Sequence, residues 1–362
     1  MLNFKKIRRD LHQIPELAFE EFETQKYLLQ ILETFPNIKI HTFDFTGIMV
    51  EYSPNSGKHK LFRADMDGLP ILESTACDFT SKNEGKMHAC GHDVHLTILL
   101  GLIEKIISEK IEQNLLFLFQ PAEEGKGGAK RIIENGILKN FDISEAFALH
   151  VTDDLKIGEI SSKGGIFFAN TQEVDVEFIG KSAHVAFPEN GKDAIFAAIE
   201  FYLEIQKEKT RNSICAFGKI SGGTAVNAVA ENCKLSGTFR TFSHRQHQIT
   251  KNKIEQTVHQ MAEKHQLKAN LSFFAYYKEV VNSEKLYHKL KKITVKNNYK
   301  FIEAKKVFTG EDFGFFTDKY EGILFWLGAR SENCKKTGLH STNFLPDEKA
   351  IEVGINLLFQ LI

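Results

Sequence analysis

The sequence has little of the residue types that mark several specialised protein classes. Among 362 residues there are only 7 prolines, 1 tryptophan and 5 cysteines, and no low-complexity tract is present. Proline-rich or repetitive composition is typical of disordered and fibrous chains, so those classes are excluded. The remaining composition, 42% hydrophobic and 26% charged, indicates a globular protein whose length suits two domains.

An excess of one charge is also lacking. Lys and Arg total 46 and Asp and Glu total 47, so no basic surplus favours nucleic acid or an anionic membrane as a partner. No stretch approaches the ~20 apolar residues of a membrane helix. The first residues are not followed by the apolar segment of a signal peptide. We therefore expect a cytoplasmic protein without a membrane or nucleic-acid partner.

Cysteine is scarce and irregularly spaced. The five residues are Cys77, Cys90, Cys215, Cys233 and Cys334. An odd number at scattered positions argues against a disulfide framework and for a reducing compartment. Four of them are most simply packing or surface thiols, and Cys90 is the exception because of its neighbours.

Residues 87–95 read MHACGHDVH and place three histidines, a cysteine and an aspartate within nine positions. An apolar run with helical spacing follows and predicts a buried helix over 93–109. The free N–H groups of a helix start favour anions and thiolates. We interpret the segment as half of a metal site. The alternative, a polar helix start capped by Asp93, leaves Cys90, His92 and His88 unexplained.

Three predicted strands each lead into acidic or histidine residues. The strands are 59–64, 114–119 and 146–149, and the residues that follow or end them are Asp65, Asp67, Glu123, Glu124 and His150. Catalytic groups of open α/β sheets collect at the carboxyl ends of strands. Asp65 and Asp67, two positions apart on an extended chain, would lie on one face. A single pair of aspartates is also common in solvated turns. The recurrence of acidic or histidine residues at the ends of three strands favours a functional site.

Enough ligand-type residues are present for more than one metal ion. They are Cys90, His92, Glu124, His150 and His340, and Asp65 or Asp67 would add a sixth. One zinc site takes about four ligands, so the number fits two divalent metals. Glu123 beside Glu124 would act as a general base toward water. The implied reaction is hydrolysis of an amide or peptide bond, with the metal left open between Mn, Zn, Co and Ni.

The pattern changes near residue 165. Strands predicted at 172–179, 214–220, 232–241 and 268–276, with helices at 192–207 and 244–265, follow the β-α-β-β-α-β order of a ferredoxin-like unit. We expect a domain at 169–278, inserted into a first domain formed by 1–168 and 279–362. The first domain then resumes with a helix at 284–296, strands at 306–308 and 323–328, and a helix from about Pro346.

The motifs together resemble metallopeptidase family M20, in its aminoacylase-like amidohydrolase branch. The segments that carry the resemblance are RRDLHQIPEL (8–17), RADMDGLP (63–70), MHACGHDVH (87–95), QPAEEG (120–125), LH (149–150), GKSAHVAFPENGKDAI (180–195), TGEDFGFF (309–316) and LHSTNFLPDE (339–348). The resemblance implies a mixed-sheet α/β hydrolase domain with two divalent metal ions. It also implies an inserted ferredoxin-like α+β domain that serves as a lid and forms a homodimer.

The resemblance also assigns roles to residues. It implies that the metal ligands are Cys90, His92, Glu124, His150 and His340. It implies Glu123 as the general base, with Asp67 and Asp65 as further catalytic residues. Where the wider family has a metal-binding His two positions before an Asp, this chain has Asp65 and Asp67, which leaves the role of Asp65 open. His88 and His95 are then supporting residues, and Asp93 is a helix cap or a bridging carboxylate.

For the substrate, the resemblance implies a small N-acylated amino acid bound with help from His184, Asn227 and Arg240. His184 would be an oxyanion donor, in its own or a partner subunit, and an arginine suits a carboxylate. The alternatives are an exposed loop histidine and an ordinary strand ion pair. FFANTQE (167–173), FTGEDFGFF (308–316) and FWLGARSE (325–332) favour a deacetylase of lysine biosynthesis. A broader hippurate-type or aminoacylase enzyme, a dipeptidase and an inactive binding homologue are the alternatives.

Overall fold

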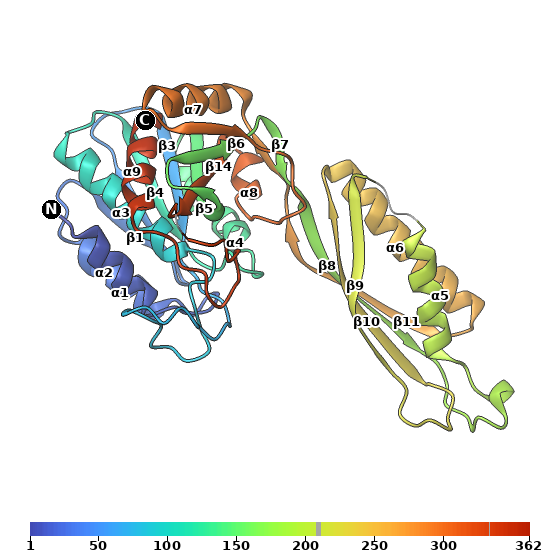
Figure 1. The fold of residues 1–362 in the computed structure, drawn as a ribbon. Helices are drawn as coiled ribbons and strands as arrows, with labels where there is room; N and C mark the ends of the chain where they lie inside the picture. The colour runs from blue at the N-terminus through green and yellow to red at the C-terminus, as the bar shows by residue number, and fades with distance from the viewer. Residues whose placement is uncertain (208–210, 333) are drawn as a thin grey trace. The chain divides into compact units, whose positions relative to one another are not determined.

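The computed structural model describes residues 1–207, 211–332 and 334–362 (Figure 1). The chain divides into two compact units. Unit 1 contains Met1–Phe167, Val280–Lys306 and Asp312–Ile362, and unit 2 contains Phe168–Glu279 and Val307–Glu311. These limits differ from the expected ones mainly at residues 307–311. That segment belongs to unit 2 because Val307 pairs with Phe168 in a short bridge.

Unit 1 is built on an eight-stranded sheet of order β1-β2-β4-β3-β5-β14-β6-β13. Its strands are β1 (Lys39–Thr42), β2 (Ile48–Tyr52), β3 (His59–Asp65), β4 (Asn114–Gln120), β5 (Ile143–Lys156), β6 (Glu159–Ser162), β13 (Lys300–Glu303) and β14 (Glu321–Arg330). The central strands β4, β3, β5 and β14 run parallel, whereas β1 and β2 pair antiparallel. The sheet is therefore mixed, as predicted. A separate two-stranded sheet joins β7 (Gly165–Phe168) and β12 (Val280–Asn282).

The helices of unit 1 and the sheet enclose one large apolar core. The helices are α1 (Phe4–His12), α2 (Phe22–Leu32), α3 (His92–Ser108), α4 (Gly128–Asn135), α7 (Glu284–Lys296), α8 (Gly314–Thr317) and α9 (Lys349–Leu361), with a 3-10 turn at Ile137–Asn140. Helix α3 lies between α1 and α9 (Figure 1). Phe62, Phe117 and Phe147 point into this core, yet their neighbours Leu61 and Leu116 are equally buried. Burial on both faces explains why the central strands read as continuous apolar runs.

Two strand predictions are wrong. Residues 306–308 form no strand, because only Val307 makes a bridge, and the strand of this region is β13, beside β6. The strand predicted at 146–149 does not stop at His150. It continues as β5 to Lys156, because its partner β14 extends alongside it and pairs Val151 with Leu327. His150 therefore lies within a strand.

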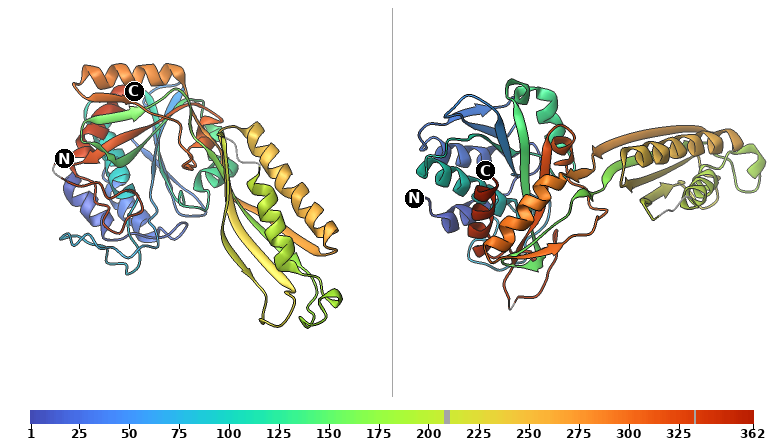
Figure 2. Two further views of the ribbon diagram at one scale, coloured as in Figure 1. Left: turned by 45° about the vertical axis from the view of Figure 1, so that its right-hand side comes forward. Right: turned by 90° about the horizontal axis from the view of Figure 1, so that it is seen from above.

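Unit 2 is an antiparallel sheet of order β11-β8-β10-β9 with two helices on one face (Figure 2). Its elements are β8 (Asn170–Ile179), α5 (Ala194–Gln206), β9 (Ser213–Gly222), β10 (Asn232–Thr241), α6 (His244–Lys264) and β11 (Lys268–Tyr277), with a 3-10 turn at Pro188–Asn190. Alternating apolar residues of β8, such as Val174, Val176 and Phe178, meet Phe201 of α5 in a core of its own. The β-α-β-β-α-β order is the predicted one. No described helix of either unit is long and apolar enough to cross a membrane.

Candidate metal centre

The segment that contains Cys90 and His92 turns sharply at Gly91, which precedes the first residue of α3. Gly91 has φ +84°, and a Cβ atom there would lie 2.3 Å from Cγ2 of Val151. Left-handed backbone and this close approach both require glycine. The turn therefore fixes Cys90 on one side of Gly91 and His92 on the other, and both side chains are buried.

Asp93 does not cap α3, which was one of the two roles expected of it. No side chain caps α3 within the described chain. The Asp93 Oδ2 atom instead lies 2.9 Å from Nε of Arg8 and 2.8 Å from Nδ1 of His12, all three side chains being buried. Asp93 thus anchors α1 to the start of α3. His88 lies nearby, and neither of its ring nitrogens has a hydrogen-bond partner among the described residues.

Three residues distant in sequence meet around the Cys90 thiol. Cys90 Sγ lies 3.3 Å from Nε2 of His150 and 3.4 Å from Nε2 of His340. The same nitrogen of His340 lies 3.2 Å from Oε1 of Glu124. His340 has a φ of +62°, and its backbone N–H donates to the Ala89 carbonyl at 2.9 Å, so its position is held by the segment that precedes Cys90.

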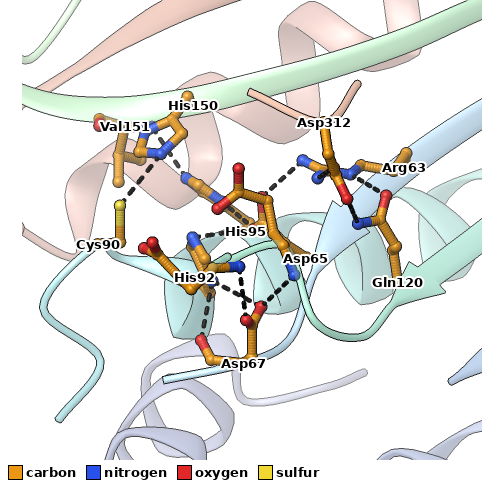
Figure 3. Close-up of polar contacts among 12 residues, drawn as sticks. Arg63, Asp65, Asp67, Cys90, His92, His95, Gln120, His150, Val151 and Asp312 are labelled. Atoms are coloured by element: carbon orange, nitrogen blue, oxygen red, sulfur yellow. Dashed lines mark hydrogen bonds and ion pairs between the residues drawn. The ribbon is translucent and has the colours of Figure 1, made fainter. Parts of the chain in front are cut away.

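The ring orientations of His92 and His150 suit metal coordination (Figure 3). His92 Nδ1 donates to the backbone oxygen of Asp67 at 2.8 Å, and its buried Nε2 has no hydrogen-bond partner within the described residues. His150 Nδ1 donates to the Val151 carbonyl at 2.8 Å and turns Nε2 toward Cys90. Metal-bound histidines typically donate their second nitrogen in this way. A buried nitrogen without a partner is otherwise unfavourable, so the donor set fits a cation.

The electrostatics point the same way. Burial lowers the pKa of His92, but the carboxylates of Asp65 and Asp67 outweigh it and raise that pKa to about 10. The surroundings of His92 therefore favour positive charge. Burial, followed by the electrostatic effect of the neighbouring His95, holds the pKa of His150 well below its usual range, so the His150 imidazole is neutral. A neutral imidazole is the form that binds metals.

Asp67 organises the two adjacent glutamates. Its Oδ1 accepts the N–H of Glu123 at 3.1 Å and its Oδ2 accepts the N–H of Glu124 at 2.8 Å. Just before them, Ala122 has φ +58° and donates its N–H to Oε1 of Glu21 at 2.8 Å. This turn brings carboxylate oxygens of Glu123 and Glu124 within 4.8 Å of a His92 nitrogen. Asp67 thus positions both glutamates through their backbone.

The carboxylate of Asp65 accepts hydrogen bonds from two side chains. Its Oδ2 accepts from Nη1 of Arg63 at 2.6 Å, and its Oδ1 accepts from Nδ1 of His95 at 2.6 Å. The second nitrogen of His95, Nε2, accepts the Val151 N–H at 2.9 Å, so both ring nitrogens of His95 are occupied. Asp65 Oδ1 also lies 3.7 Å from Nε2 of His92. Asp65 therefore supports the cluster through its contacts with His92 and His95.

Sequence reasoning assigned no role to Arg63, Gln120 or Asp312, which form a buried network beside the cluster (Figure 3). Arg63 Nη2 donates to Asp312 at 2.7 Å and its Nε donates to Gln120 at 2.8 Å. Asp312 also accepts the backbone N–H of Ala129 at 2.9 Å. The sequence did contain one signal for this network, namely Arg63 within the strand Lys60-Leu61-Phe62-Arg63-Ala64. An arginine is seldom buried unless it is paired, so its position in a buried strand indicates a buried acidic partner.

The three residues expected to bind substrate lie in unit 2 and are not brought together by it. His184 is exposed, and its neighbour Val185 donates a backbone N–H to the carbonyl of Asn227, which is also exposed. Arg240 lies near the other end of β10, where its Nη1 donates to the Phe308 carbonyl at 2.8 Å. His184 and Asn227 are thus neighbours, and Arg240 is separate from them within unit 2.

Comparison with known proteins agrees with the motifs. The model of peptidase family M20/M25/M40 matches residues 61–362. N-acetyldiaminopimelate deacetylase of Bacillus subtilis (strain 168) is 40% identical over 361 residues, which cover 97% of this chain and 96% of that protein. The enzyme of the same name from Bacillus cytotoxicus is 41% identical over 369 residues, covering 99% and 97%.

Two solved structures share the whole fold. A putative aminohydrolase from methicillin-resistant Staphylococcus aureus superposes with a TM-score of 0.91 at 26% identity, covering 99% of this chain and 94% of that one. A Bacillus subtilis protein described as a dinuclear metal binding peptidase of the M20 family gives 0.84 at 29% identity, covering 99% and 96%. The sequence match over residues 61–362 and the full-length relatives establish that the chain belongs to peptidase family M20/M25/M40.

Proposed function

We propose that this protein is a metal-dependent amide hydrolase that converts N-acetyl-L,L-diaminopimelate into acetate and L,L-diaminopimelate. The observation that carries the proposal is the meeting of five ligand-type side chains with a further buried glutamate, Glu123, beside them. The five are Cys90, His92, Glu124, His150 and His340. The substrate is taken from the full-length relatives named N-acetyldiaminopimelate deacetylase. As an enzyme of amino-acid biosynthesis it would act in the cytoplasm.

The donor set suits two divalent metal ions. Two groups of ligand atoms, each within 4.8 Å of one another, share Cys90: one adds His92 and His150, the other adds Glu124 and His340. These residues would hold the ions, and the mixed sulfur, nitrogen and oxygen donors accept Mn, Zn, Co or Ni. When bound, such ions lower the pKa of a coordinated water and polarise a carbonyl group.

The chain's own part in the reaction falls to Glu123. Its side chain is almost fully buried next to His92 and Glu124, and Asp67 fixes its backbone. Glu123 would take a proton from the attacking water as the water oxygen bonds to the acetyl carbonyl carbon. It would then give that proton to the amine nitrogen as the C–N bond breaks. Asp67 and Asp65 would act as positioning residues.

The test is a substrate panel on metal-free protein reloaded with Mn, Co, Ni or Zn. We expect acetate release from N-acetyl-L,L-diaminopimelate to exceed turnover of benzoylglycine, other acylated amino acids and dipeptides. Good turnover of those compounds without acetate release would replace the proposal by a broader hippurate-type or aminoacylase amidohydrolase, or by a dipeptidase. Glu123→Gln should lower kcat by about 10²–10⁴-fold and retain metal. An inactive binding homologue would show no turnover at all.

We also propose a homodimer formed through unit 2. Helix α5 exposes a row of apolar side chains, with Phe196 51% and Leu203 55% exposed. Strand β9 is at the edge of the sheet and exposes Ile214 and Ile220. An apolar helix face beside an unpaired strand edge favours association. Leu203→Lys should shift sedimentation toward monomer, whereas the same change at Leu72, an exposed leucine of unit 1, should not. The lid role of unit 2 stays a prediction.

His184, Asn227 and Arg240 are kept as proposed substrate-binding residues. The exposed side chains of His184 and Asn227 are accessible to a substrate or a second copy of the chain. If His184 stabilises developing negative charge, His184→Ala should lower kcat more than it raises KM. An Arg240→Lys variant with unchanged KM would remove Arg240 from the list of binding residues.

A further inference from the structure

A second group of metal-ligand side chains lies in unit 1, apart from the five described above. It consists of His12 at the end of α1 and Glu73 and Cys77 in the loop after β3. His12 Nε2 lies 3.2 Å from Oε1 of Glu73, and Cys77 Sγ lies 3.9 Å from the same oxygen. All three ligand atoms lie within 4.8 Å of one another. The His12 side chain is fully buried, that of Glu73 is 5% exposed, and Cys77 is half-buried.

The spacing of the three donors suits a tetrahedral ion. Bonds of about 2.0–2.3 Å to nitrogen, oxygen and sulfur place neighbouring donors roughly 3.3–3.7 Å apart around zinc. The nitrogen–oxygen and oxygen–sulfur separations of 3.2 and 3.9 Å lie close to these values. The nitrogen and sulfur atoms lie within 4.8 Å of each other, so side-chain rotations would bring all three donors to one ion.

His12 is oriented as a metal ligand. Its Nδ1 lies 2.8 Å from Oδ2 of the buried Asp93, which is itself paired with Arg8 at 2.9 Å. A carboxylate that accepts Nδ1–H in this way recurs behind zinc-bound histidines. Without an ion, Nε2 donates its own proton to Oε1 of Glu73 at 3.2 Å, and a metal ion bound there would replace that proton. Nε2 here faces Glu73 and Cys77. The orientation of the ring is therefore decided before any ion arrives.

The loop is held in the shape that brings Cys77 to Glu73. Ser81 donates its N–H to Oε2 of Glu73 at 2.7 Å, and Ala76 has φ +54°, a left-handed conformation that reverses the chain just before Cys77. The ring of Phe79 lies 4.7 Å from the guanidinium of Arg8 and so ties the loop to α1. A pocket of about 390 Å³ is lined in part by Glu73, Ala76 and Ser81, so it reaches the group at Glu73.

We propose that His12, Glu73 and Cys77 bind one further divalent metal ion of the zinc class. Binding forms a metal–sulfur, a metal–nitrogen and a metal–oxygen bond, and it releases the Cys77 thiol proton and any proton on His12 Nε2 to solvent. Because Asp93 adjoins His92, the ion would also stiffen the start of α3. Nothing in this proposal depends on the substrate or on the hydrolytic reaction.

The test measures cobalt bound per chain after removal of all metal with a chelator. Cys77→Ser should bind one Co²⁺ per chain fewer than the wild type and lose part of the thiolate-to-cobalt charge-transfer absorption. Glu73→Gln should weaken the same ion's binding by at least tenfold. Cys334→Ser removes an exposed thiol and should change neither quantity. Circular dichroism spectra identical to wild type show that the variants are folded.

The same comparison made in a Cys90→Ser background separates this site from the candidate metal centre. The Cys77-dependent ion and its absorption should persist there. Equal Co²⁺ binding by folded wild-type and Cys77→Ser proteins, with unchanged absorption, would overturn the proposal. In that case a proton shared between His12 and Glu73 is what joins the two side chains.

Discussion

The Nδ1 atom of His95 lies 2.6 Å from Oδ1 of Asp65, and both side chains are buried. The pair gives Asp65 a role at the position where the wider family resemblance led us to expect a metal-binding histidine. Burial disfavours its charge, but His92, Arg63 and His95 outweigh burial and hold the pKa of Asp65 well below its usual range. A charged Asp65 then orients His95, whose Nε2 accepts the N–H of Val151 next to His150.

Asp65→Asn should therefore destabilise the fold as well as the site. Removal of one partner from a buried ion pair leaves the other charge uncompensated and costs about 3–5 kcal/mol. Asp312 still pairs with Arg63, so we expect the free energy of unfolding to fall by about 3 kcal/mol in urea titrations. Asp154→Asn, which breaks a surface pair with Lys336, should change it by less than about 1 kcal/mol. A loss that small for Asp65→Asn would contradict the assigned role.

Gly91→Ala tests whether the turn between Cys90 and His92 needs glycine for space or only for its backbone conformation. Gly85 has a similar φ of +74°, but no described atom outside its chain neighbours lies within 4 Å of a Cβ there. Gly85→Ala should therefore cost about 1–2 kcal/mol from the left-handed backbone alone. Gly91→Ala adds the clash with Val151, about 1–3 kcal/mol more, and should weaken metal binding. Equal unfolding free energies for the two variants would show that the clash is relieved without cost.

Asp153 holds the loop that precedes His340. Its Oδ2 accepts from the Thr337 hydroxyl and the Gly338 N–H, each at 2.9 Å. Asp153→Ala removes the oxygen that accepts both of these bonds. Loss of such support typically costs 10–100-fold in metal affinity, so we expect faster metal loss in chelator dialysis followed by metal analysis. Asp154→Ala is the neighbouring control and should keep wild-type metal content.

Glu21 makes folding stability depend on pH. Burial, followed by the nearby charge of Asp67, raises the pKa of Glu21 from its usual 4.5 to about 7. Because folding raises the pKa of Glu21, the protonated side chain stabilises the folded state fully at pH values below the pKa of Glu21 in the unfolded chain. This stabilisation is lost as the pH rises through about 7. Glu21→Gln removes that loss. Relative to wild type, the variant should gain up to ~3 kcal/mol in unfolding free energy between pH 5 and pH 9.

The measurement for Glu21 is a series of urea titrations across that pH range. Glu20→Gln, a neighbouring and exposed residue, controls for the loss of one negative charge. Parallel pH profiles for wild type and Glu21→Gln would show that Glu21 does not titrate with folding. Because Glu21 accepts the Ala122 N–H ahead of Glu123, kcat measured separately over the same pH range should also differ in its pH dependence between wild type and Glu21→Gln.

The amino-acid sequence alone determined the order of the main elements and the residue types of the candidate site. Continuous apolar runs predicted the central strands because these strands are buried on both faces. The MHACGHDVH segment indicated a metal site because it concentrates residue types that bind metals. Local patterns carry such information because it depends on neighbours in the chain. The resemblance to family M20, drawn from the motifs, was confirmed by the match over residues 61–362.

Only the tertiary structure decided how the polar residues are paired. Cys90 meets residues 60 and 250 positions away, and Asp93 meets His12 across 81 positions. A local pattern therefore offered Asp93 as a cap, whereas the fold gave its carboxylate to Arg8 and His12. No sequence motif joins His12, Glu73 and Cys77, although His12 lies within RRDLHQIPEL. The three residues converge because packing of a helix and a distant loop, rather than spacing along the chain, places their donor atoms together.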